Sequence, residues 1–144
     1  MKNISFILLI VIFTSLCINS QIETASNFTI IDGDTIRLES GQRVRLIGID
    51  TPENGEYCYT EATEKLREMI SGKEIIMKSG YTDTDVYDRL LRYIYVGEEF
   101  VNIEMVRSGF AYAIDTDDNM WEKILNAEIM AKNERVRCLW ATYE

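Results

Sequence analysis

The sequence predicts a mostly β fold of the α+β class, a five-stranded Greek-key barrel with about three helices packed on it. Five short segments rich in β-branched and aromatic residues occur before residue 100, with one helical segment between the third and the fourth. Two further segments with helical periodicity follow. The chain has 144 residues, 47% of them hydrophobic and 27% charged, which is the size and balance of one folded domain.

The strands are indicated by β-rich runs and by the turns between them. They are expected over residues 28–31, 35–38, 43–49, 73–78 and 90–96. The turn signal Glu-Ser-Gly-Gln at 39–42 separates the second run from the third, so we expect the first three strands to pair antiparallel. An acidic loop joins the last two strands.

The helices are indicated by apolar side chains at helical spacing and by residues that begin or end helices. They are expected over residues 60–70, 102–108 and 120–133. Thr60 and Asn102 are candidate N-caps, Gly72 and Gly109 are candidate ends, and residues 110–114 are expected to be extended. A barrel of the OB-fold type has this order of elements.

The first twenty residues have the form of a signal peptide, since Lys2 is followed by an apolar run and then by smaller, more polar residues up to Ser20. We therefore expect cleavage and export, to the periplasm, the cell surface or the medium. An uncleaved membrane anchor and a lipid on Cys17 are the alternatives. The expected division of the chain is a leader at 1–20, a short polar arm at 21–26 and a folded domain at 27–144.

Cleavage would leave two cysteines, Cys58 and Cys138. Two cysteines in an exported domain favour one disulfide, and two unpaired thiols are the alternative.

Charge and composition exclude several classes of function. The 15 basic and 24 acidic residues give a net charge of −9, which argues against nonspecific attraction to nucleic acid or anionic membranes. A polyanion would have to be met by a local cationic patch. The chain has no His, so a His base, nucleophile or zinc ligand is excluded.

Two short charged segments interrupt the apolar strands. Asp32 and Asp34 flank Gly33, so an extended backbone would place both carboxylates on one face, although Asp-Gly is also a common turn signal. The third strand contains Arg45 and ends in Asp50-Thr51-Pro52-Glu53, where the proline stiffens the exit. An ordinary loop of solvated acids is the alternative for this second segment.

Three motifs in order carry a resemblance to a known family. They are IDGDT at 31–35, VRLIGIDTPE at 44–53 and DVYDRLL at 85–91. With matching residues at 101–111 and at Leu139-Trp140, they resemble the staphylococcal nuclease (thermonuclease) family over about residues 27–140. The resemblance implies an OB-fold and an exported, calcium-dependent phosphodiesterase that cuts DNA, RNA or both.

The resemblance also implies a metal site. Asp34 and Asp50 would hold Ca²⁺ through carboxylate oxygens, and Thr51 would hold it through its backbone carbonyl. Asp32 would orient a metal-bound water. Arg45 and Asp50 are an odd number of positions apart, so both can serve one site only if the strand bends, for which Gly48 is the obvious place.

The remaining roles implied by the resemblance concern the phosphate. Glu53 would be the general base, Arg45 and Arg89 would bind the phosphate and stabilise its added charge, and Tyr87 would contact or stack near a terminal phosphate. Phosphodiester hydrolysis needs an activated water and charge compensation. Without His, a carboxylate base, a bound dication and Arg are the groups that remain for this chemistry.

The sequence also departs from the family. Val86 stands where Lys or Arg is common, and Asp88 stands where many members have Gly. Some relatives place Tyr against a nucleotide base in the segment that here holds Asp115, Asp117 and Asp118. We therefore expect altered base stacking and strand binding, and we interpret these three acids as a solvated loop, with a second metal site as the alternative.

The sequence thus predicts a monomeric nuclease whose partner is single-stranded or locally open DNA or RNA and that needs no obligatory protein partner. The main alternative is a catalytically weak OB-fold module that binds a phosphorylated ligand, nucleic acid or a protein. Arg45, Glu53 and Arg89 together favour the enzyme, because a binding module needs no base. A metal-storing surface domain is a third possibility, favoured only by the acidity.

Overall fold

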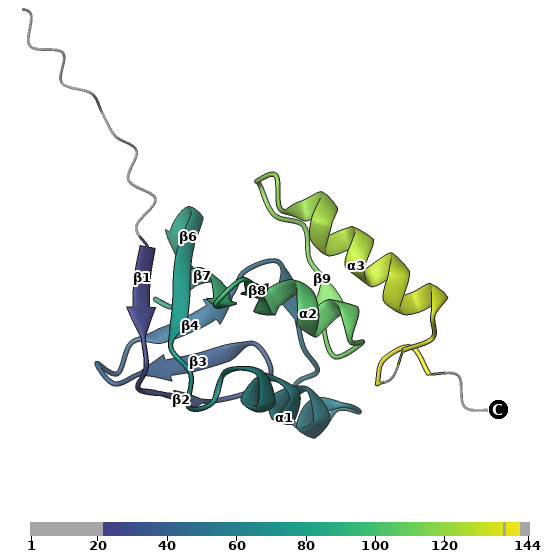
Figure 1. Cartoon of the computed structure of the whole chain (residues 1–144), viewed down its shortest axis with the longest axis horizontal. Helices are drawn as coiled ribbons and strands as arrows, with labels where there is room; N and C mark the ends of the chain where they lie inside the picture. The colour runs from purple at the N-terminus through teal and green to yellow at the C-terminus, as the bar shows by residue number, and fades with distance from the viewer. Residues whose placement is uncertain (1–21, 137, 142–144) are drawn as a thin grey trace, which may run out of the picture.

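The computed structural model describes residues 22–136 and 138–141, in which a curled sheet is flanked by three helices (Figure 1). The main sheet has the order β1-β6-β7-β4-β3-β2, with β8 paired to β7. Its strands are β1 (Ile22–Ala25), β2 (Phe28–Ile30), β3 (Thr35–Leu38), β4 (Arg43–Leu46), β6 (Ile75–Thr84), β7 (Leu90–Val96) and β8 (Glu99–Phe100). β4 and β7 pair in parallel, and the other pairs are antiparallel. The sheet curls into a half-barrel with an OB-fold arrangement, which confirms the predicted fold class.

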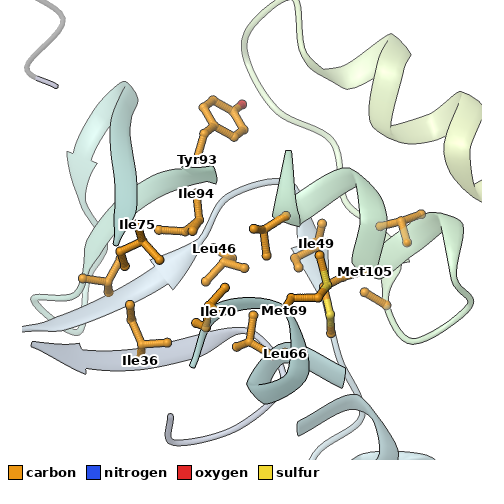
Figure 2. Close-up of a cluster of buried hydrophobic side chains, with 14 of the residues drawn as sticks. Ile36, Leu46, Ile49, Leu66, Met69, Ile70, Ile75, Tyr93, Ile94 and Met105 are labelled. Atoms are coloured by element: carbon orange, nitrogen blue, oxygen red, sulfur yellow. The ribbon is translucent and has the colours of Figure 1, made fainter. Parts of the chain in front are cut away.

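The helices are α1 (Tyr59–Ile70), α2 (Val101–Arg107) and α3 (Trp121–Asn133). α2 contacts β7 and both other helices (Figure 1). The core between sheet and helices is apolar, and Figure 2 shows its side chains converging from β3, β4, β6, β7, α1 and α2. Fully buried members include Ile36, Leu46, Leu66, Ile94 and Met105. Burial of this cluster stabilises the packing of the helices on the sheet.

The predicted strand over 43–49 is interrupted. β4 ends at Leu46, a turn follows at Ile47 and Gly48, and β5 (Ile49–Asp50) pairs with β9 (Tyr112–Ala113) in a second small sheet. Gly48 has φ +76°, and a Cβ there would lie 2.5 Å from Cδ1 of Ile124. Glycine is needed at this bend for both reasons, and the bend lies where the sequence required it.

Several element boundaries differ from the prediction. The segment expected as a polar arm contains β1, which pairs with β6, and β6 continues to Thr84 rather than ending at 78. α1 begins at Tyr59 after Cys58, so Thr60 is not its N-cap. Asn102 does not cap α2 either, because its side chain is buried and bonds Ile94 N–H and the Ile47 carbonyl. Contacts with residues distant in the sequence, such as the pairing of β1 with β6 and the bonds of Asn102, account for these differences.

The predicted signal peptide lies outside the described residues, so the structure does not bear on it. Within the described part of the chain, none of the helices has the length and apolar character that crossing a membrane requires.

A disulfide joins Cys58, at the start of α1, to Cys138, beyond α3, with the two Cα atoms 5.9 Å apart. Reduction should lower the stability of the fold by about 4 kcal/mol, because the bond closes a loop of 80 residues in the unfolded chain. Activity should survive below the new melting temperature, since neither cysteine contacts the charged site described below. Thermal melts with and without reductant, with thiol counting by mass spectrometry, test this, and an unchanged melting temperature after full reduction would contradict it.

Candidate functional site

Asp34 lies just before β3 and is almost fully buried. Its Oδ1 accepts a hydrogen bond from the Thr35 hydroxyl at 3.0 Å, and its Oδ2 accepts from the Thr51 N–H and hydroxyl, both at 2.9 Å. A Cβ on Gly33 would lie 2.9 Å from the Thr51 side chain and from Ala62 Cβ, so glycine allows these segments to meet. Asp34 thus ties the start of β3 to the loop after β5.

Arg45 lies between two carboxylates. Its Nη1 is 2.6 Å from Asp34 Oδ2, and its Nη2 donates to Asp50 Oδ1 at 2.8 Å. Nη1 is buried and, apart from this ion pair with Asp34, makes no hydrogen bond within the described residues. The bend at Gly48 is what brings Asp50 back to Arg45. The guanidinium is therefore held between two carboxylates.

Asp32 supports this arrangement through the backbone. Its Oδ1 accepts from the Asp34 N–H at 3.1 Å. Burial, and then the negative charge of Asp34, raise the pKa of the Asp32 carboxyl above its ordinary value. The fold therefore holds two carboxylates close together at an energetic cost, which a cation near them would reduce.

Arg89 is held by Asp85 in the turn between β6 and β7. Arg89 Nε donates to Asp85 Oδ2 at 2.7 Å, while Asp85 Oδ1 accepts from the N–H groups of Tyr87 and Arg89. The terminal nitrogens of Arg89 have no hydrogen-bond partner among the described residues. Asp88 has φ +58°, a left-handed conformation that Asp tolerates better than most residues, so the turn forms without glycine. Asp85 thereby fixes the position of the Arg89 side chain and leaves its two terminal nitrogens without a protein partner among the described residues.

Replacing Asp85 with Asn should loosen this turn. Burial by itself raises the pKa of Asp85, but hydrogen bonds from Arg89 and from the Tyr87 N–H outweigh it and hold the pKa below its ordinary value of 3.8. The ionised form therefore stabilises the fold above pH 3.8, and this contribution is lost as the pH falls through the lowered value. Asp85→Asn should cost about 1 to 2 kcal/mol at pH 7 and nothing in strong acid. Denaturant melts of both proteins across this pH range test it, and a difference that persists at low pH would contradict it.

A cavity of about 280 Å³ brings the two arginines together. Arg45 and Arg89 line it from β4 and from the turn before β7. The loop with Asp115, Asp117 and Asp118 lines it as well. Asp118 is fixed there, because its Oδ2 accepts from the Tyr93 hydroxyl at 2.7 Å; burial, and then this bond, raise the pKa of Tyr93. The cavity thus has both cationic and acidic residues in its lining.

The structure places Glu53 and Tyr87 outside the lining of this cavity, and the predicted metal ligands Asp34, Asp50 and Thr51 also lie outside it. Glu53 is exposed in the loop after Pro52, and its N–H donates to Glu56 Oε2 at 2.7 Å. The Tyr87 ring is mostly exposed and lies 5.6 Å from the Arg89 guanidinium. Tyr81 and Thr82 do line the cavity, although sequence reasoning placed them in a loop without a role.

The predicted metal ligands are hard oxygen donors, and Arg45 lies between their two carboxylates. Asp34 and Asp50 offer carboxylate oxygens, of which the Asp50 group is half exposed, and the Thr51 carbonyl is the third predicted ligand. In the described ranges, no cluster of three or more His, Cys, Asp or Glu residues is arranged to hold a metal. Ca²⁺ takes six to eight oxygens, so water and a substrate phosphate would have to complete the shell.

Comparison with known sequences bears on the family of the chain. A sequence model described as "Staphylococcal nuclease homologue" matches residues 43–142. The chain belongs to the staphylococcal nuclease family. Among relatives from this comparison, the thermonuclease of Staphylococcus intermedius is 31% identical over 93 residues, which cover 58% of this chain and 55% of the relative.

Two other relatives are at a similar distance. The thermonuclease of Staphylococcus hyicus is 28% identical over 104 residues, or 66% of this chain and 62% of that one. A protein of Escherichia coli O157:H7 described as an uncharacterized endonuclease is 31% identical over 90 residues, or 60% and 58%. The match therefore spans little more than half of these members of the staphylococcal nuclease family.

Proposed function

We propose that this protein is a nuclease that hydrolyses phosphodiester bonds of DNA, RNA or both. The observation that supports this most directly is that Arg45 and Arg89 line one cavity while carboxylates hold both guanidinium groups in place. The terminal nitrogens of Arg89 keep hydrogen-bonding capacity free for a phosphate. Membership of the staphylococcal nuclease family and relatives described as nucleases point to the same chemistry.

The proposed reaction is attack of water on the phosphorus. A P–O bond forms to the water oxygen, the ester P–O bond breaks, and the leaving oxygen takes a proton from solvent. Glu53 is proposed to accept the proton of the attacking water, and its position in an exposed loop requires that the side chain turn toward the bound phosphate. Arg45 and Arg89 stabilise the charge that builds on the phosphate oxygens.

Calcium is the proposed cofactor, held by Asp34, Asp50 and the Thr51 carbonyl, with Asp32 orienting a water. A bound dication would supply charge neutralisation and an acidified water. Arg45 already compensates part of the charge of Asp34 and Asp50, so we expect weak calcium binding in the absence of a phosphate.

The experiment that tests this function incubates the purified protein with a labelled single strand, with Ca²⁺ or with a chelator. We expect cleavage only with Ca²⁺. If the protein binds the strand but cleaves it under neither condition, the nuclease proposal is wrong and the OB-fold binding module is supported instead.

We also propose that the mature protein acts outside the cytoplasm as a monomer. The leader-like residues 1–20 support export, as does the pairing of Cys58 with Cys138, because disulfides persist in oxidising compartments. Mass spectrometry of the protein recovered from the source cells, read for the new N-terminus, tests this proposal.

A further inference from the structure

The strand pairing of β6 with β7 contains a large bulge beside the cavity. Ser79 pairs with Arg92 and Thr84 pairs with Leu90, so residues 80–83 lie opposite a single residue of β7, Leu91. A bulge bends a strand and redirects its side chains, and bulges are frequent next to binding sites. Residues 80–82 of this bulge line the cavity.

The bulge is held from the inside of the protein. Arg92 is almost fully buried, and its Nη1 contacts Asp83 Oδ1 at 2.8 Å and donates to the Asp83 carbonyl at 3.1 Å. The other side of the Arg92 guanidinium donates to Glu23 of β1 at 2.8 and 3.2 Å. A Cβ on Gly80 would lie 2.9 Å from Ile47 Cδ1, so glycine lets the bulge approach the cavity wall. The position of the bulge is therefore built into the fold.

Tyr81 is the residue that this bulge presents. Its side chain is 85% exposed, although it lines the same cavity as Arg45 and Arg89. No ring contact or cation contact of Tyr81 occurs within the described residues. An apolar ring held in water beside phosphate-binding groups adds nothing to the core, so a ligand is the partner that would use it.

The loop that also lines the cavity does not offer an aromatic ring. Residues 114–119 read Ile-Asp-Thr-Asp-Asp-Asn. The stacking surface in this cavity is therefore on β6. The volume of about 280 Å³ lies at the small end of ligand pockets, with room for one nucleotide rather than a run of them.

We propose that Tyr81 determines substrate specificity by stacking on one unpaired base next to the phosphate held by Arg45 and Arg89. This proposal rests on the proposed function and names its substrate class, single-stranded nucleic acid. A base inside a duplex is already stacked and cannot lie on the ring. Stacking does not depend on net charge, so it suits a protein with a charge of −9.

The test measures binding and turnover separately for Tyr81→Ala, Tyr81→Phe and the wild type. The probes are a short single-stranded oligodeoxynucleotide, the same strand with abasic sites, and its duplex. We expect Tyr81→Ala to weaken binding of the intact strand, and to raise KM, roughly 10-fold or more, with kcat within about 2-fold. Tyr81→Phe should match the wild type, and neither variant should change binding of the abasic strand.

A matched control is Tyr57→Ala, since Tyr57 is exposed but does not line this cavity. It should leave all three probes unaffected. Three outcomes would each overturn the proposal. The wild type and Tyr81→Ala could bind the intact strand equally, or Tyr81→Ala could lose as much binding to the abasic strand as to the intact one. The third outcome is no measurable binding of single strands. Binding is measured without cleavage, so a Tyr81-dependent loss of binding in a protein that never cleaves would refute the nuclease and leave Tyr81 supported.

Discussion

Replacing Arg89 with Ala is expected to lower kcat by about 10² to 10³-fold and to leave the fold intact. The side chain extends from a turn that is fixed by Asp85 Oδ1, which accepts hydrogen bonds from the backbone N–H groups of Tyr87 and Arg89, so loss of the Arg89 side chain removes a charge from the cavity without unfolding the turn. The lost group is the one whose terminal nitrogens remain free for phosphate oxygens. Single-turnover rates on a saturating single strand, with circular dichroism as the check on folding, measure the effect.

Two further substitutions show whether the loss is specific to this guanidinium. Arg89→Lys keeps the charge but not the planar pair of donors, so most of the loss should remain. Arg37→Ala removes an exposed arginine of β3 that does not line the cavity, and it should have little effect. If Arg89→Lys restores the full rate, the role of Arg89 is attraction of charge alone.

Glu53→Gln is expected to have a comparable effect, about 10² to 10⁴-fold in kcat, because the amide cannot accept the proton of the attacking water. The substitution is nearly isosteric, and the backbone N–H of residue 53 keeps its bond to Glu56. The loop should therefore hold its shape. The pH dependence of the residual rate is the second measurement, since removal of a base abolishes the acidic limb of the profile.

The control for Glu53→Gln is Glu99→Gln, which makes the same change in charge at an exposed position of β8. It should be neutral. A Glu53→Gln protein with the turnover of the wild type would remove Glu53 from the mechanism and leave water activation to another group.

Much of the candidate site could be predicted because its charged residues lie within short motifs. Arg45 and Asp50 are five positions apart, and the parity of their spacing required a bend, for which Gly48 was the obvious place. The contact of Arg45 with Asp50 is the result. Local sequence therefore determined the contact of Arg45 with Asp50, whereas the contacts of Asp34 with Arg45 and Thr51 join separate segments.

The residues that were missed depend on distant contacts. β1 is a short segment in which apolar and polar residues alternate, and it forms a strand because it pairs with the edge of β6. Tyr81 follows a glycine and precedes polar residues, a pattern typical of a loop. The bulge that keeps it in a strand is anchored by Arg92, eleven positions later, and through Arg92 by Glu23. No window of sequence around Tyr81 contains that information.

The parallel pairing of β4 with β7 also has a consequence for how the protein folds. Val44 pairs with Leu90, so the two strands can pair only when the long segment between them in the sequence, which contains α1 and β6, closes as a loop. The β2, β3 and β4 hairpins are local and can form early, whereas this closure carries the entropy of a long loop. Arg45 is on one of the two strands and Arg89 immediately precedes the other. A chain in which β4 and β7 have not yet paired therefore has no assembled cavity.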